Sequence, residues 1–313
     1  MATSQQTQAT TMPTAGAGRR ARFSWTPYLF ILPHLIFFTA FLAWPFFYGI
    51  YISLFDFDFL RPEYRPFVGL RNYANLFDPA SLQFRDFWNA MGNTVEFVLY
   101  SAPPLVILAL LLAVLLNGRY PGRNFFRGLY FAPYALSVTV AAVLWRWIFQ
   151  QGGLINYYLG ELGLPQPSWL GSMPWAWVSL VVATVWWTIG FNTVIFLAAL
   201  QEIPDSLYEA AAIDGAGAAQ QFFNITIPML RPVLLFVVTI TLLASANLFG
   251  QPFIMTERGG PVNQTEPVML RIYTEGILFN RMGSAAAMSV FVAAILLALT
   301  TLNFRIFGRA EQE

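Results

Sequence analysis

The feature that most constrains this sequence is the stretch from Phe23 to Phe55, which contains no formally charged residue when His34 is neutral. A helix that crosses the hydrocarbon core of a membrane needs about 20 consecutive apolar residues. Backbone groups inside that core must bond to one another, and this requirement favours helices. The stretch therefore predicts one long transmembrane helix at residues 27–54, kinked where Pro33 and Pro45 interrupt its hydrogen bonds.

Five further apolar runs, separated by polar stretches, predict an all-α integral membrane protein with six transmembrane helices. The composition agrees, because 57% of the residues are hydrophobic and only 11% are charged, whereas a soluble domain carries about 25% charged residues. The predicted six-helix domain occupies residues 27–307, and its spans lie at residues 27–54, 93–117, 128–149, 175–200, 232–255 and 284–304.

Two polar tails flank this domain. Residues 1–26 are rich in Thr, Gln, Ala, Ser and Gly and are predicted to be a disordered tail, and residues 308–313 form a short second tail. Arginines close to a span are typical of the cytoplasmic side of a membrane. The total count of arginines differs little between the two sides, but those nearest the spans favour cytoplasmic N- and C-termini: Arg19, Arg20, Arg22, Arg119, Arg123, Arg127, Arg231, Arg305 and Arg309.

The residue types that are absent argue against several kinds of chemistry. The sequence has no Cys and a single His, and Arg supplies all 17 of its basic residues. A P-loop or a Schiff base needs Lys, a thiolate site needs Cys, and a multi-His zinc site needs several His. We therefore predict no catalytic residue, no metal site and no cofactor in this chain, so that any ATP and Mg²⁺ would be bound by partner subunits. A net charge of +1 gives no reason to expect nucleic acid as a partner.

A polar segment at residues 201–230 separates the fourth and fifth predicted spans. Ser206 and Glu209 have the spacing of a helix capping box, and three alanines follow them. Gly215 and Gly217 then permit a turn that other residues resist. The segment contains four acids and no base, so it suits a basic partner better than an anionic lipid surface. Those acids are Glu202, Asp205, Glu209 and Asp214.

The order Ile203-Pro204, Leu207-Tyr-Glu-Ala-Ala, Asp214-Gly-Ala and Ile225-Thr-Ile-Pro228 resembles the EAA loop of ABC importer permeases, most closely the maltose-type carbohydrate family. In that family the loop is a cytoplasmic coupling helix that docks into the ATPase subunit. An ordinary interfacial helix between two spans is the alternative. The resemblance implies ATPase contacts from Leu207, Tyr208, Glu209, Ala210, Ala211, Asp214, Gly215 and Ala216.

The resemblance also implies an assembly. Its members are this chain, a second homologous permease subunit, two ATPase subunits that bind ATP and Mg²⁺, and an extracytoplasmic solute-binding protein. The implied location is the cytoplasmic membrane of a bacterium or archaeon, where the chain contacts lipid. A six-helix secondary carrier or channel is the alternative function, but the predicted spans show no spaced pair of titratable groups for a proton relay. A non-transporting scaffold would not explain the EAA-like pattern.

Polar and aromatic residues of the fourth and fifth spans are the candidates for solute contact. Trp187 and Phe191 are four residues apart, as are Asn247 and Gln251, so each pair shares a helix face. Asn192 and Ser245 lie nearby in the sequence. Aromatic rings suit the apolar faces of a sugar, and amides suit its hydroxyls. Each of the six could instead serve helix packing, and the sequence leaves open maltodextrin, trehalose, another sugar or glycerol phosphate.

Overall fold

The computed structural model describes residues 26–61, 63–118 and 121–307. The regular elements in these ranges are helices, and β-structure there is limited to two isolated bridges. Within the described residues, five helices are long and apolar enough to cross a membrane, or six if one bent pair is a single span, which confirms the all-α membrane prediction. The predicted tails lie outside the described residues, apart from Thr26. The chain divides into two compact units, residues 1–48 and 49–313.

The first unit contains a helix that changes its winding midway. A π-helical turn, Thr39–Ala43, separates α1 from α2, and the Trp44 N–H bonds the carbonyl of Thr39. A proline ring collides with the carbonyl four residues before it, so this wider turn explains how Pro45 fits without ending the helix. The helix bounds are Thr26–Phe38 for α1 and Trp44–Ile52 for α2, which continues into the second unit.

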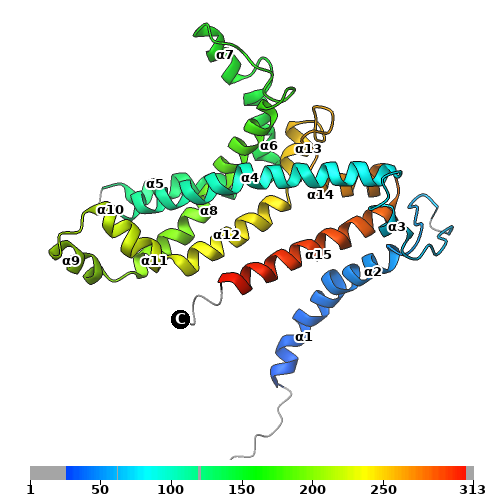
Figure 1. Cartoon of the computed structure of the whole chain (residues 1–313), viewed down its shortest axis with the longest axis horizontal. Coiled ribbons are helices and arrows are strands. Elements are labelled where there is room, and N and C mark those ends of the chain that lie inside the picture. The colour runs from blue at the N-terminus through cyan, green and yellow to red at the C-terminus, as the bar shows by residue number, and fades with distance from the viewer. Residues whose placement is uncertain (1–25, 62, 119–120, 308–313) are drawn as a thin grey trace, which may run out of the picture. The chain divides into compact units, whose positions relative to one another are not determined.

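The second unit is built around α4, which packs against α8 and α12 and meets α15 near its N-terminal end (Figure 1). The sequence prediction began this span at residue 93, but α4 begins at Leu82 because Ser81 caps it. The Ser81 hydroxyl accepts a hydrogen bond from the Phe84 N–H at 3.0 Å. The long helices of this unit are α4 (Leu82–Asn117), α8 (Trp175–Glu202), α12 (Arg231–Ala246) and α15 (Met282–Phe307).

Three apolar clusters follow α4 from one end to the other. The first lies at the C-terminal end of α4, where Ala113 and Leu116 meet Phe196 of α8 and Val237 of α12. The second joins Phe97 to side chains of α8 and of two further helices, α6 (Val138–Phe149) and α13 (Gly250–Met255). The third lies at the N-terminal end of α4, around Phe87, Leu76, Val268, Met288 and Val292.

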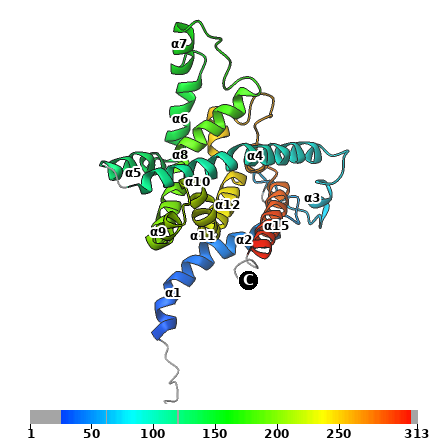
Figure 2. The same cartoon turned by 60° about the vertical axis from the view of Figure 1, so that its left-hand side comes forward.

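The third predicted span, residues 128–149, contains a sharp bend. A helical piece ends at Ala135, α6 begins at Val138, and the two pieces meet at 97°. Leu136 and Ser137 between them are extended, and the Ser137 hydroxyl caps α6 by accepting from the Val140 N–H. Figure 2 shows α6 and α7 standing away from α4 beyond this bend. The pieces are α5 (Arg123–Phe131), the 3₁₀ turn η2 (Ala132–Ala135), α6, and α7 (Leu154–Glu161).

The fifth predicted span, residues 232–255, is broken between α12 and α13. The Asn247 side chain donates to the Leu243 carbonyl at 2.7 Å, and the chain unwinds before α13 starts at Gly250. Pro252 favours the break, because in a continuous helix it would lack a donor and would crowd the Leu248 carbonyl. A proline alone does not require a break, since α4 continues through Pro103 and Pro104. Gly250 then allows a close approach to α6, since a Cβ there would lie 2.7 Å from Val138.

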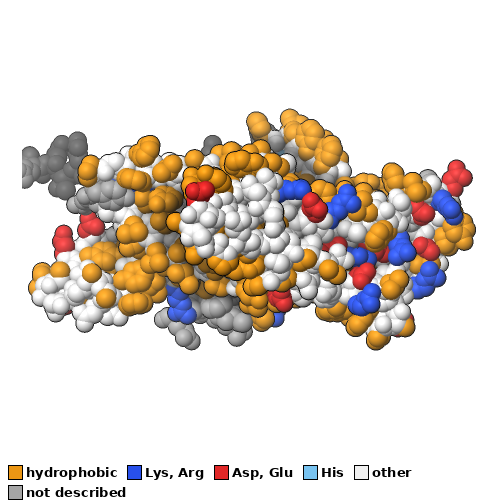
Figure 3. All heavy atoms as spheres, turned by 90° about the horizontal axis from the view of Figure 1, so that it is seen from above, with side chains coloured by type: hydrophobic (Ala, Val, Ile, Leu, Met, Phe, Trp, Pro, Cys, Tyr) orange, Lys and Arg blue, Asp and Glu red, His pale blue; other side chains and the backbone are white. Residues whose placement is uncertain are grey.

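Two groups of short helices lie at opposite ends of α4 (Figure 1). Figure 3 shows charged side chains gathered toward one end of the molecule, where α3 and the start of α4 lie, while the rest of that face is mainly hydrophobic or uncharged. One group comprises α9 (Asp205–Ile213), α10 (Ala218–Gln221), the π-helix η3 (Phe222–Thr226) and α11 (Ile227–Met229). The other comprises α3 (Arg71–Ala74), α14 (Val268–Tyr273) and the π-helix η4 (Thr274–Leu278).

Candidate functional site

A cavity of about 500 Å³ opens where α12 breaks, between the first and second apolar clusters. It is bounded by α8, by η2 and the start of α6, and by the unwound segment that joins α12 to α13. Irregular backbone within a membrane span is tolerated where it lines a cavity. All six residues predicted to contact a solute line this cavity: Trp187, Phe191, Asn192, Ser245, Asn247 and Gln251.

One wall of the cavity is aromatic. The Phe191 ring stacks on Tyr134 of η2 with centroids 4.8 Å apart, and Trp187 lies 6.3 Å from the same Tyr134 ring. The Trp187 indole N–H is already committed, because it donates to the Leu136 carbonyl at 3.1 Å. Gly190 lets η2 and α5 approach α8 this closely, since a Cβ there would collide with the Tyr130 carbonyl oxygen. The wall therefore offers ring faces rather than donors.

Three of the six predicted residues are buried, and each bonds to a neighbouring helix. Asn192 donates to the Thr241 hydroxyl at 3.0 Å, and Ser245 accepts from the Ser101 hydroxyl at 3.1 Å. Gln251 makes a longer contact, 3.4 Å, with the Thr184 hydroxyl. These bonds connect α12 and α13 to α4 and α8. Trp187, Phe191 and Asn247 are more accessible, so they are the members of the set best placed to touch a solute.

The pairing of Asn247 with Gln251 differs from the sequence expectation. Their four-residue spacing predicts one helix face, but the break lies between them, so that Asn247 caps the end of α12 and Gln251 lies in α13. Sequence reasoning also missed Tyr134, Thr184, Thr188 and Thr241, which line the same cavity. The available signal for the break was Pro252, four residues after Leu248. No comparable signal marks Tyr134, because the bend that brings it to the cavity depends on packing.

The α9 loop, residues 201–230, holds all eight residues predicted to contact an ATPase. No residue of α9 itself is buried, and Ile213 at its end is 87% exposed. Tyr208 faces inward, where its hydroxyl lies 2.9 Å from that of Thr226 and ties α9 to η3. Among the described residues, neither Glu209 nor Asp214 has an ion-pair partner. The loop therefore presents alanines, exposed apolar side chains such as Ile213, and the carboxylates of Glu209 and Asp214 to its surroundings.

The N-terminal end of α9 differs from the sequence prediction. The predicted capping box is not formed, because α9 begins at Asp205, with Pro204 as its cap residue, and Ser206 lies inside the first turn. The C-terminal end is a Schellman turn, in which the Ala216 N–H bonds the Ala211 carbonyl and the Gly215 N–H bonds that of Ala212. Gly215 has φ +83°, a conformation that glycine adopts without strain.

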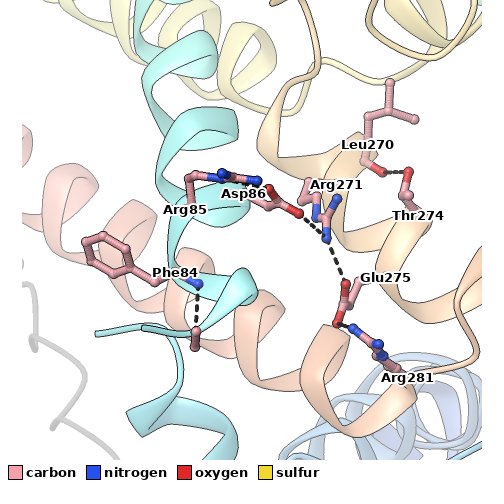
Figure 4. Close-up of polar contacts among 9 residues, drawn as sticks. Phe84, Arg85, Asp86, Leu270, Arg271, Thr274, Glu275 and Arg281 are labelled. Atoms are coloured by element: carbon pink, nitrogen blue, oxygen red, sulfur yellow. Dashed lines mark hydrogen bonds and ion pairs between the residues drawn. The ribbon is translucent and has the colours of Figure 1, made fainter. Parts of the chain in front are cut away.

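The α14 loop, residues 256–281, has the opposite character. Its residues bond to α4, where the Asn93 side chain donates to the carbonyls of Asn263 and Glu266 at 2.8 and 3.0 Å. Figure 4 shows Arg271 between Asp86 and Glu275, with 3.0 Å to each carboxylate. Glu275 is fully buried and also lies 3.6 Å from Arg281. The charges of Arg271, Glu275 and Arg281 are therefore neutralised within the chain.

Glu266 is a further buried acid of the α14 loop. Burial raises the pKa of this carboxyl above its ordinary value, and repulsion from Asp86 adds to the effect. The positive charge of Arg271 and a hydrogen bond from Thr274 act in the opposite direction. The net shift is upward, so folding disfavours the ionised form of Glu266.

Comparison with known proteins identifies the family. The sequence pattern described as "Binding-protein-dependent transport system inner membrane component" matches residues 80–312. The chain is 35% identical to the probable ABC transporter permease protein YurN of Bacillus subtilis over 92% of its length and 97% of that protein. This chain belongs to the binding-protein-dependent inner membrane transport family.

Other relatives of this chain are named for different solutes. It is 36% identical to the sn-glycerol-3-phosphate permease UgpA of Yersinia pestis, covering 91% of this chain and 95% of UgpA. It is 31% identical to the arabinooligosaccharide permease AraP of Bacillus subtilis, covering 92% and 90%. The same fold occurs in a bacterial alginate ABC transporter, with TM-score 0.78 at 24% identity over 91% and 95% of the two chains.

The family defines the role of the chain. It is a permease subunit of an ABC importer, a transport component rather than a catalytic subunit. A stand-alone secondary carrier or channel is not favoured.

Proposed function

We propose that this permease carries a carbohydrate-type solute through the cavity at the α12–α13 break, driven by a separate ATPase that docks on the α9 loop. The observation that carries the proposal is the convergence of an aromatic wall and polar side chains on one cavity at a broken span. Aromatic rings cover the C–H faces of a sugar ring, and hydroxyl and amide groups bond its hydroxyls. A volume of about 500 Å³ is within the usual range for small-molecule sites, about 300–1,000 Å³.

The position of the cavity suits alternating access. One apolar cluster, around Phe196 and Val237, separates it from the α9 loop, and another, around Phe97 and Trp177, lies on its other side. Opening one cluster while the other stays packed would expose the cavity to one side of the membrane at a time. The bonds from Asn192, Ser245 and Gln251 to neighbouring helices would move α12 and α13 together with α4 and α8.

The α9 loop suits a coupling role. Its exposed helix has a smooth alanine face and ends at a Schellman turn, and in the described part of the chain Glu209 and Asp214 have no ion-pair partner. We place this loop in the cytoplasm, together with both chain termini, and we expect Leu207 through Ala211 and Asp214 through Ala216 to contact the ATPase. The working importer would contain a second permease subunit, two ATPase subunits with ATP and Mg²⁺, and an extracytoplasmic solute-binding protein in a cytoplasmic membrane.

Uptake by the reconstituted importer tests the cavity. Trp187→Ala removes part of the aromatic wall without removing a charge, and we expect ATP-dependent sugar uptake to fall at least about tenfold, as for loss of a buried anchor. The control is Trp147→Ala on α6, because Trp147 is 57% exposed and lies outside the cavity. Equal uptake in the two variants would contradict the proposed pathway, and uptake without any ATPase subunit would contradict the importer mechanism.

A further inference from the structure

The named relatives divide by the charge of their solutes. Arabinooligosaccharides are uncharged, sn-glycerol-3-phosphate is an anion, and alginate is described as an acidic polysaccharide. Sequence identity does not choose among them, because the values are 31%, 36% and 24%. The cavity of this permease, whose transport role is proposed above, supplies a physical criterion.

The cavity is lined without charge. Its described lining contains no Arg, Lys, His, Asp or Glu. A phosphate or a carboxylate that leaves water needs a cationic partner or several donors, because an unpaired buried charge is very unfavourable. This lining offers a phosphate or a uronate group no such partner.

The arginines on the surrounding elements are occupied elsewhere. Arg127 of α5 donates to the Leu116 carbonyl at 3.0 Å. Arg146 of α6 donates to the Ile254 carbonyl at 3.1 Å and pairs with Glu257 at 2.6 Å. Neither lines the cavity. An anion bound in the cavity would therefore meet neither guanidinium group.

The polar side chains that do line the cavity are neutral, and several of them bond to neighbouring groups. Asn192 bonds Thr241, Gln251 contacts Thr184, and the Asn247 amide nitrogen bonds the Leu243 carbonyl. Among the described residues, none of the buried side-chain atoms that lack a hydrogen-bond partner belongs to a residue lining this cavity. The donors that remain are the hydrogens of hydroxyl and amide groups, which bring no positive charge to an anion. The same lining suits an uncharged sugar. The hydroxyls of a sugar both donate and accept hydrogen bonds, and its C–H faces can pack against Trp187 and Tyr134.

We propose that the solute of this permease is an uncharged carbohydrate and that the cavity rejects phosphate esters and acidic sugars. The inference rests on the proposed function, since it assumes that the solute passes through this cavity. The permease would then discriminate against anionic solutes because its cavity lacks a cationic group, in addition to any discrimination by the solute-binding protein.

The direct test compares four solutes with the complete importer in proteoliposomes. Two are neutral, arabinotriose and maltotriose, and two are anionic, sn-glycerol-3-phosphate and an alginate trisaccharide. We expect ATP-dependent uptake of at least one neutral trisaccharide and at most background uptake of both anions. Greater uptake of either anion, or no uptake of either neutral trisaccharide, would overturn the inference. Uptake that persists without the ATPase subunits would instead refute the proposed importer mechanism, and the same four solutes would still report the charge preference.

A pair of charge variants tests the cavity independently of the binding protein. Asn247→Asp and Asn247→Lys place opposite charges at the break, and each variant is assayed with the solute that wild-type protein transports best. A neutral solute is expected to lose uptake in both variants, with rates that agree within about threefold. An anionic solute would be transported at least about tenfold better by the Lys variant, since a positive charge favours an anion by electrostatic complementarity. That asymmetry would overturn the inference.

Discussion

The α9 loop and the α14 loop both carry acids, but they treat them in opposite ways. In the α14 loop Glu275 is fully buried between two arginines, and Glu266 is 4% exposed. In the α9 loop Glu209 and Asp214 are exposed and have no ion-pair partner in the described chain. Acids that are neutralised internally hold a loop to its own bundle. Acids that are left exposed on a rigid helix are available to another subunit.

The largest effect should come from breaking the buried ion cluster. Arg271→Ala leaves Glu275 and Asp86 without their shared cation, and removing one partner of a buried pair costs about 3–5 kcal/mol. We expect a strong loss of thermal stability in detergent. The control is Arg71→Ala, because the Arg71–Asp56 pair is exposed on both sides and should contribute less than about 1 kcal/mol. A similar loss of thermal stability in the two variants would show that the buried cluster contributes no more than an exposed ion pair.

The second effect concerns transport and not stability. Gly215→Asp places a carboxylate beside the end of α9, where a Cβ meets no atom within 4 Å, and Asp tolerates a left-handed backbone better than most residues. We expect normal membrane insertion and uptake reduced at least about tenfold, as for a hot spot in an interface. Gly217→Ala is the matched control, because Gly217 has φ −72° and open space. Unchanged uptake in Gly215→Asp would argue against docking at this turn.

Removing one exposed acid should have a smaller effect. Glu209→Ala substitutes a better helix former at an exposed site of α9, so its effect on stability should stay within about 0.5 kcal/mol. If Glu209 contacts a basic surface of the ATPase, solute-stimulated ATPase activity should fall a few-fold in the variant. The dependence of that activity on salt concentration should also weaken, because a charge at the edge of an interface mainly affects the association rate. The measurement is ATPase activity of the assembled complex against ionic strength. An unaltered salt dependence would remove Glu209 from the interface.

The smallest effect is a pH dependence that only the α14 loop should show. Because burial raises the folded-state pKa of Glu266 above the ordinary value of 4.5, its stabilising contribution is fully present below about pH 4.5 and is lost as the pH rises through the folded-state pKa. Glu266→Gln keeps the shape without the titration. The stability difference, wild type minus variant, should therefore be largest at acid pH and decline toward pH 7. A difference that does not change with pH would exclude this role.

Local patterns predicted much of the helical framework. Apolar runs located the long helices, and i,i+4 spacing brought Trp187 and Phe191 to the same cavity. The bend before α6 could not be predicted from the same patterns, because it depends on how Tyr134 and Gly190 pack between segments distant in sequence. The break at Asn247 was predictable in part, since Pro252 disfavours a continuous helix through Leu248. The ion pairs of Arg271 depend on the fold, because Asp86 lies on another helix.

The central claim is that the α9 loop faces the ATPase on the cytoplasmic side, while the α14 loop faces the opposite side of the membrane. The sequence contains no Cys, so single cysteines report on one position each. Ile213 and Val262 are 87% and 91% exposed, which makes Ile213→Cys and Val262→Cys a matched pair for a membrane-impermeant maleimide. We predict labelling of Val262→Cys in intact cells, and labelling of Ile213→Cys only after permeabilisation and only when the ATPase is absent. Labelling of Ile213→Cys from outside intact cells would contradict the account.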